Sequence, residues 1–68
     1  MNRLTYLFAG YLRRDLTQAE ESELKVFLGD EPTMRAFEML LIHEDEIFDD
    51  AALAMATATR VLNTAQHH

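Results

Sequence analysis

Apolar residues recur every three or four positions along three stretches of the chain, which is the spacing of one face of an α-helix, and a fourth stretch is rich in the strong helix former alanine. The first stretch covers residues 2–14 and the second covers residues 18–28. The third begins near Glu31 and runs to about Phe48, and the fourth covers residues 50–65. The first stripe consists of Leu4, Leu7, Phe8, Tyr11 and Leu12. The pattern therefore predicts an all-α protein.

Helix-capping signals mark both ends of the second stretch. Thr17 followed by Glu20 has the spacing of a capping box, in which each side chain binds a free backbone N–H group. Gly29 can adopt the left-handed backbone that closes a helix. Asp30 can cap the next helix, and Pro32 is tolerated in its first turn. We therefore expect the second helix to be complete, with its neighbours packed on it.

The third and fourth stretches differ in how firmly they can be held. The third is apolar over more than half of its circumference, so we expect it to be central or covered by another surface. The fourth is rich in alanine and forms a helix readily, but its large apolar residues are few and scattered. We therefore predict a small three-helix bundle plus a fourth helix that packs loosely or projects as an arm.

The length of 68 residues predicts one domain, which we place at residues 1–66. His67 and His68 match the remnant of an affinity tag and are excluded from any chemistry. A chain of this size buries only about 60% of the surface that its unfolded form exposes. We therefore expect a hydrophobic surface that a partner chain completes.

The net charge of −6 favours a partner with basic surfaces and argues against direct binding to nucleic acid. A merely solubilising role is the alternative explanation for this charge. The chain has no cysteine, no run of about 20 apolar residues and no secretion signal at its N-terminus. The absence of cysteine suits a reducing compartment.

No arrangement of side chains in the sequence indicates an enzyme. The only internal histidine, His43, stands among acidic residues on a helix, and no nucleophile is paired with it. His43, Glu46 and Asp50 would share one side if the third helix continued, but a fourth ligand is lacking. We therefore predict no catalytic activity and no metal site.

Several short features follow one another between Tyr11 and Glu21. Tyr11-Leu12 ends the first helix, Asp15-Leu16-Thr17 forms a short acidic turn, and Glu20-Glu21 opens the second helix. In order and spacing this segment resembles the N-terminal anti-sigma domain of bacterial regulators that restrain extracytoplasmic-function sigma factors. The resemblance covers about residues 4–42, and it implies a three-helix bundle with a fourth helix set apart.

That family typically carries a His-x3-Cys-x2-Cys-Arg zinc motif between its second and third helices. The corresponding positions here are Phe27, Glu31 and Met34, followed by Arg35. The chain therefore resembles the zinc-free branch, to which the FecR-type regulators belong, and no cofactor is expected. The resemblance implies that Phe27 and Met34 replace the metal with apolar packing.

The resemblance also implies a function, which is to bind and sequester a sigma factor and so block its access to RNA polymerase. An amphipathic arm suits docking of a helix into a groove. An ordinary role in the core of the chain is the alternative for the same residues. In family members a membrane span follows, so this chain can be the cytoplasmic domain of a longer inner-membrane protein. The candidate partner-binding residues are Ile47, Phe48, Leu53, Met55, Val61 and Leu62.

Two other classes of function remain open at this point. In the first, residues 50–65 pair with a second copy, and the domain is a self-associating module that forms a homodimer. In the second, the short helices form a small DNA-binding helix-turn-helix domain. The negative charge disfavours the second, because Arg35 is the only cation of the third helix.

Overall fold

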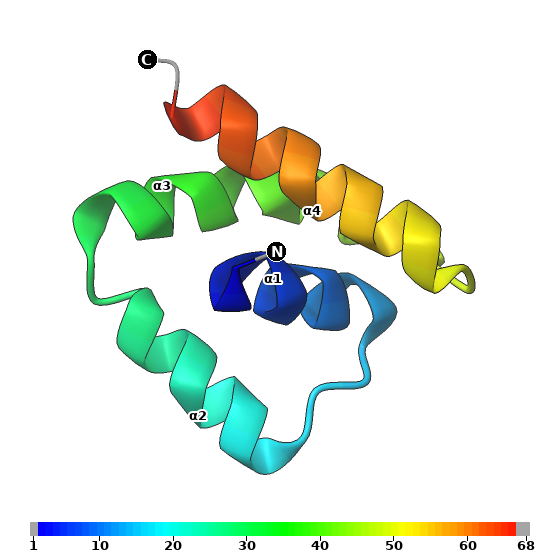
Figure 1. Cartoon of the computed structure of the whole chain (residues 1–68), viewed down its shortest axis with the longest axis horizontal. Helices are drawn as coiled ribbons and strands as arrows, with labels where there is room; N and C mark the ends of the chain where they lie inside the picture. The colour runs from blue at the N-terminus through cyan, green and yellow to red at the C-terminus, as the bar shows by residue number, and fades with distance from the viewer. Residues whose placement is uncertain (1, 67–68) are drawn as a thin grey trace.

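The computed structural model describes residues 2–66, and over that range it is all-helical with no β-strand (Figure 1). The predicted all-α class and small helical bundle are confirmed. The suggested tag remnant, His67 and His68, lies outside the described residues. The elements are α1 (Arg3–Arg13), α2 (Gln18–Phe27), α3 (Glu31–Leu40), the short 3-10 helix η1 (Leu41–His43) and α4 (Ala51–Gln66).

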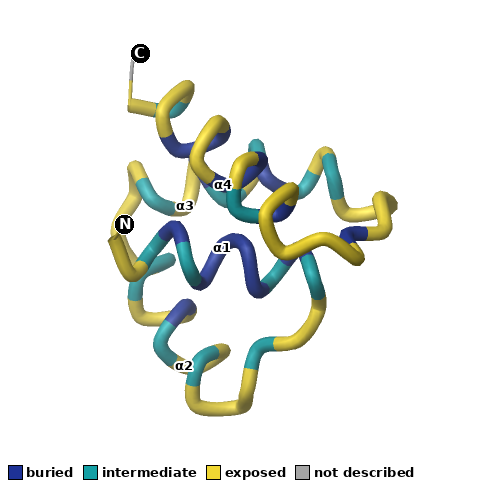
Figure 2. The backbone as a smooth tube through the Cα atoms, turned by 45° about the vertical axis from the view of Figure 1, so that its right-hand side comes forward, coloured by how far each residue is buried: buried dark blue, intermediate teal, exposed yellow. Residues whose placement is uncertain are grey.

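Helix α1 is the central element of the bundle. It lies between α4 on one side and α2 on the other, and the buried part of the chain is concentrated along it (Figure 2). Leu7 and Phe8 of α1 are fully buried, as is Leu40 of α3. Within α2 only Leu24 is buried. The expectation that both neighbours pack on the second helix is therefore confirmed for α1 and wrong for α3, because α2 offers too little apolar surface to serve as the centre of the bundle.

Helix α4 packs along α1 and also contacts α3, which differs from the loose or projecting position expected of it (Figure 1). Ala54 and Ala58 are fully buried, and Val61 and Leu62 further along the helix are buried as well. Small side chains at a helix contact allow the two helix axes to approach closely. A helix face with few large apolar residues can therefore still pack firmly against its neighbours.

Helix α3 is shorter than expected, because the helical path ends at His43 rather than near Phe48. Three acidic residues follow at positions 44–46, and negative charge is unfavourable at the C-terminal end of a helix. The last turn tightens, with the Glu44 N–H donating to the Leu41 carbonyl. The loop that follows returns the chain to the core, where Phe48 is buried.

The predicted helix starts are confirmed. Thr17 and Glu20 form the capping box, and the Asp30 side chain accepts from the Thr33 N–H at the start of α3. The left-handed backbone expected at Gly29 is wrong, because no glycine has a positive φ. That backbone occurs instead at Arg14, which closes α1 with φ of 60°.

The packing that the resemblance implied between α2 and α3 is only partly present. The Phe27 ring is half-buried against the core, as expected, whereas Met34 is exposed. Helix α2 packs mainly against α1 rather than against α3. The two helices that flank the Asp30 turn therefore diverge instead of being clasped together.

Candidate protein-binding surface

The loop that joins η1 to α4, residues 44–50, combines acidic and apolar side chains on the surface. Ile47 within it is 84% exposed, and Ile42 just before it is 79% exposed. Leu53, in the first turn of α4, is 51% exposed. Exposed apolar side chains that form one patch rimmed by polar residues mark protein-binding surfaces. We call the loop together with Ile42 and Leu53 the acidic face.

Among residues 2–66, the carboxylates of the acidic face have no lysine or arginine as a partner. Residues 36–59 contain six carboxylates and neither lysine nor arginine. Glu46 pairs with His43, and the Asp50 side chain accepts from the Ala52 N–H at 2.8 Å at the start of α4. Across residues 2–66, no lysine or arginine forms an ion pair with a carboxylate of this loop. Its negative potential is therefore available to attract a basic partner.

The six predicted partner-binding residues do not lie on one surface. Ile47 and Leu53 are exposed on the acidic face, and Met55 is half-buried. Phe48, Val61 and Leu62 are buried in the core of the chain, so the structure gives them the alternative role of intrachain packing. They were assigned to an arm because α4 was expected to be loosely held.

Sequence reasoning did not include Ile42 among the binding residues. A signal for it was present, because Ile42 falls partly off the apolar face of the third stretch. Its exposure in the structure follows from the end of the helix at His43, which leaves Ile42 in the last 3-10 turn.

A groove of about 620 Å³ lies beside the acidic face, over the C-terminal half of α1. Its two walls are α2 and the segment around η1. Charged residues from both walls, among them Lys25 and Glu44, complete its lining. The groove therefore presents an apolar surface with a charged rim. Its apolar lining consists of Tyr11, Leu12, Leu16, Leu24, Leu28 and Phe37.

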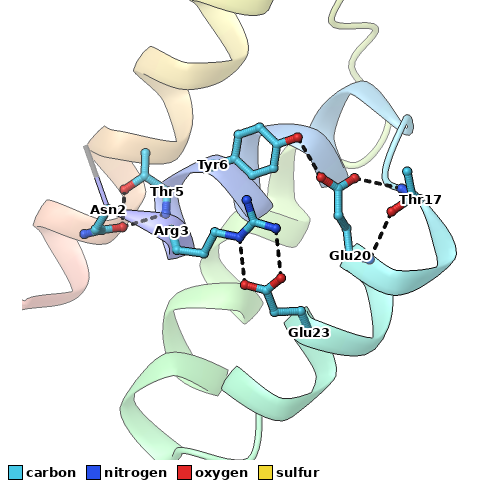
Figure 3. A network of polar contacts seen from close by, with 7 residues as sticks. All are labelled: Asn2, Arg3, Thr5, Tyr6, Thr17, Glu20 and Glu23. Atoms are coloured by element: carbon cyan, nitrogen blue, oxygen red, sulfur yellow. Dashed lines mark hydrogen bonds and ion pairs between the residues drawn. The ribbon is translucent and has the colours of Figure 1, made fainter.

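Polar contacts on the surface hold α2 against α1 (Figure 3). The Arg3 guanidinium donates two hydrogen bonds to the Glu23 carboxylate, at 2.7 and 2.9 Å, and lies 4.8 Å from the centre of the Tyr6 ring. The Tyr6 hydroxyl donates to Glu20 at 2.6 Å. Glu20 is also the acidic member of the capping box. These contacts position α2, and therefore one wall of the groove.

The same contacts shift the pKa values of the groups involved. The pKa of Glu20 is lowered by the hydrogen bond from the Thr17 backbone N–H and by that from the Tyr6 hydroxyl. The pKa of Glu23 is lowered by its hydrogen bonds from Arg3. The pKa of Tyr6 is raised, because its hydroxyl donates to the Glu20 carboxylate. The ionised carboxylates are therefore the forms that the structure favours.

Acidification is expected to weaken the attachment of α2. A carboxyl with a lowered folded pKa stabilises the fold above its unfolded pKa, and this contribution is lost as the pH falls through the folded pKa. Unfolded glutamate titrates near pH ~4.3, so the loss should begin below about pH 5. In thermal melts between about pH 7 and pH 3, Glu20→Gln/Glu23→Gln should show a shallower fall in Tm than the parent.

The matched control for this pH prediction is Glu21→Gln/Glu38→Gln. Both glutamates are exposed, and neither lies in the contacts between α1 and α2. This variant should follow the pH dependence of the parent. An equal fall in Tm with decreasing pH for all three proteins would show that the Glu20 and Glu23 contacts do not stabilise the fold.

No cluster of three metal-ligating side chains occurs among residues 2–66. His43 and Glu46 form a pair, whereas the Asp50 side chain is occupied at the start of α4. Over the same range, no helix has the length and apolarity needed to cross a bilayer.

These observations define the chain as a small all-helical domain with an acidic, partly apolar face and an adjacent groove. Comparison of the chain with protein-family models, with curated proteins and with solved structures finds no match.

Proposed function

We propose that this domain binds and sequesters an extracytoplasmic-function sigma factor, and that the acidic face is its contact surface. The observation that carries the proposal is the loop of carboxylates that pair with no lysine or arginine among residues 2–66, together with the exposed side chains of Ile42 and Ile47. The order of motifs between Tyr11 and Glu21, which resembles the anti-sigma domain, supports the choice of partner.

The two kinds of side chain on the acidic face would contribute in different ways. Carboxylates attract a basic partner and raise the rate of association more than the final affinity. Apolar side chains provide affinity when a partner removes them from water, at about 25 cal/mol per Å² of apolar area. A sigma factor held on this face would have part of its surface covered and would be excluded from RNA polymerase. This inhibition would take place in the cytoplasm.

The proposal changes which residues of the chain meet the partner. The contact residues are Ile42, Ile47 and Leu53, which are exposed, whereas Phe48, Val61 and Leu62 are buried. Because α4 is already packed on α1 and α3, binding needs no release of this helix. The sigma factor is instead recognised by the folded bundle.

Binding to a purified two-domain sigma factor of the extracytoplasmic-function type tests the proposal. The parent should form a stable complex, and Ile47→Asp/Leu53→Asp should weaken it at least about tenfold, equivalent to ~1.4 kcal/mol. Both substitutions remove exposed apolar surface and add charge that opposes an apolar contact. Isothermal titration calorimetry with the separately purified proteins measures the change.

The control is Val26→Asp, which makes the same kind of change at an exposed position on α2, away from the acidic face. It should retain the affinity of the parent, and circular dichroism should show all variants to be helical. Absence of a complex with any such sigma factor, or an equal loss for the control, would overturn the proposal.

A further inference from the structure

We infer that the groove between α2 and η1 binds one amphipathic helix that carries basic residues beside its apolar face. The inference deepens the proposed function, because it assigns the element with which the partner enters the domain. It rests on that function for the partner's identity alone. The shape and charge of the groove can be tested without the partner.

The apolar lining of the groove is only partly covered by the chain itself. Leu12 and Leu24 are buried at its base, whereas Tyr11, Leu16 and Leu28 above them are half-buried. Apolar surface in a concave site is the usual lining of a docking groove. The groove therefore offers several adjacent side chains to an apolar stripe.

The arrangement of the helices gives this groove the form of an unfilled position in a bundle. Helix α2 packs mainly on α1, while α3 and η1 diverge from it, so two walls stand over one base. The opposite side of α1 is already covered by α4 (Figure 1). Packed helices lie about 8–10 Å apart, and a partner helix lying on α1 would contact both walls. Helix-in-groove docking uses anchors at i, i+3 or i+4, and i+7.

The charge of the rim selects a basic helix. On the α2 wall, Glu21 and Lys25 are four residues apart and offset each other. On the η1 wall stand Glu44 and Asp45, from which the acidic loop continues. Arg14 also lines the groove, and its guanidinium donates to the Glu44 backbone carbonyl at 2.6 Å rather than to a carboxylate. The rim therefore carries the carboxylates of Glu21, Glu44 and Asp45 against the cations of Arg14 and Lys25. Basic residues of the bound helix should therefore face the η1 wall.

The same charge disfavours a second copy of this chain as the occupant. The chain carries a net charge of −6, so two copies repel each other. Helix α4, the longest helix, has Arg60 as its only lysine or arginine. A basic segment of another protein is the better match.

Titration with synthetic peptides tests the inference. The probes are a leucine–lysine peptide of about 14 residues, or four helical turns, with leucines at i, i+3, i+4 and i+7, and its leucine–glutamate counterpart. The lysine peptide should bind at least about tenfold more tightly than the glutamate peptide. Backbone amide signals of Leu16, Lys25 and Glu44 should shift in NMR spectra of the full chain on binding.

Two variants with exposed substitutions locate the charge effect. Glu44→Lys/Asp45→Lys reverses the η1 wall and should weaken binding of the lysine peptide at least about tenfold. Lys25→Gln, on the α2 wall, should leave the affinity for the lysine peptide unchanged or should raise it. An equal loss in both variants would overturn the assignment of basic residues to the η1 wall.

Three results would overturn the groove itself as a helix site. In the first, the lysine peptide does not bind at concentrations up to about 1 mM, so that any dissociation constant is too high for a specific contact. Alternatively, the shifts occur at Ile42, Ile47 and Leu53 and not at Leu16 or Lys25. In the third case, raising the protein concentration without peptide produces the groove shifts, which assigns the groove to a second copy.

The peptide titration and the sigma-factor titration distinguish the two proposals. If the peptide binds in the groove but no sigma-factor complex forms, the proposed function is overturned and the helix-binding site is supported. A sigma-factor complex that depends on Ile47 and Leu53, without peptide binding, removes the helix site and retains the proposed function.

Discussion

Replacing Phe8 by alanine is expected to unfold most of the protein near its normal working temperature. Phe8 is fully buried in the central helix, and its ring meets the Phe37 ring edge-on with centroids 5.8 Å apart. Removal of a buried phenylalanine side chain costs about 3–5 kcal/mol. A domain of this length has a total stability of roughly 3–10 kcal/mol, at about 0.05–0.15 kcal/mol per residue. The loss is therefore comparable to the whole stability.

Thermal unfolding followed by circular dichroism measures this effect. A loss of 1 kcal/mol lowers the Tm of a domain this small by roughly 4–8 °C, so we expect a fall of at least about 12 °C. Phe27→Ala is the matched control, because it removes the same side chain from a half-buried position on α2. Its Tm should fall by clearly less. A larger fall for Phe27→Ala than for Phe8→Ala would show that α2, and not α1, organises the core.

The sequence predicted the helix starts well because the contacts that make them are local. The capping box joins Thr17 and Glu20, only three residues apart, through hydrogen bonds of 2.9 and 3.1 Å. The same holds for Asp30 and the Thr33 N–H at 3.3 Å. These geometries depend on the residue types and their spacing, with little influence from the rest of the chain.

The central position of α1 was not predictable in the same way. Both α1 and the third stretch have broad apolar stripes, and their spacing does not say which of them other helices will cover. The groove was missed for the same reason, since it depends on the divergence of α2 from α3. A capping pattern locates the turn at Asp30 but does not give the angle between the helices that it joins.

The candidate binding surface was predicted in part. The sequence predicts Ile47 and Leu53 as binding residues, and both are exposed in the structure. Val61 and Leu62, expected on an exposed arm, are buried in the structure, because small residues of α4 also hold this helix on the bundle. Ala54 and Ala58 proved to be among the most buried residues of the chain. Alanine is ambiguous in a sequence, since its high helix propensity suits exposed positions and its small size suits closely packed ones.

A leucine at position 58 tests how closely α4 is seated. Ala58 is fully buried on α4, and adding three carbon atoms there forces neighbouring side chains or the helix itself to move. Overpacking of this kind costs about 1–3 kcal/mol, which corresponds to a Tm lower by roughly 4–24 °C. Differential scanning calorimetry of Ala58→Leu measures the change.

Ala56→Leu is the control, because Ala56 is exposed on the same helix and leucine is nearly as good a helix former as alanine. Its Tm should stay close to that of the parent, so the difference between the two variants isolates packing from helix propensity. A helix that docked only loosely would accept leucine equally well at both positions. Equal melting of the two variants would therefore return α4 to the role of a separable arm, and Val61 and Leu62 would again be available to a partner.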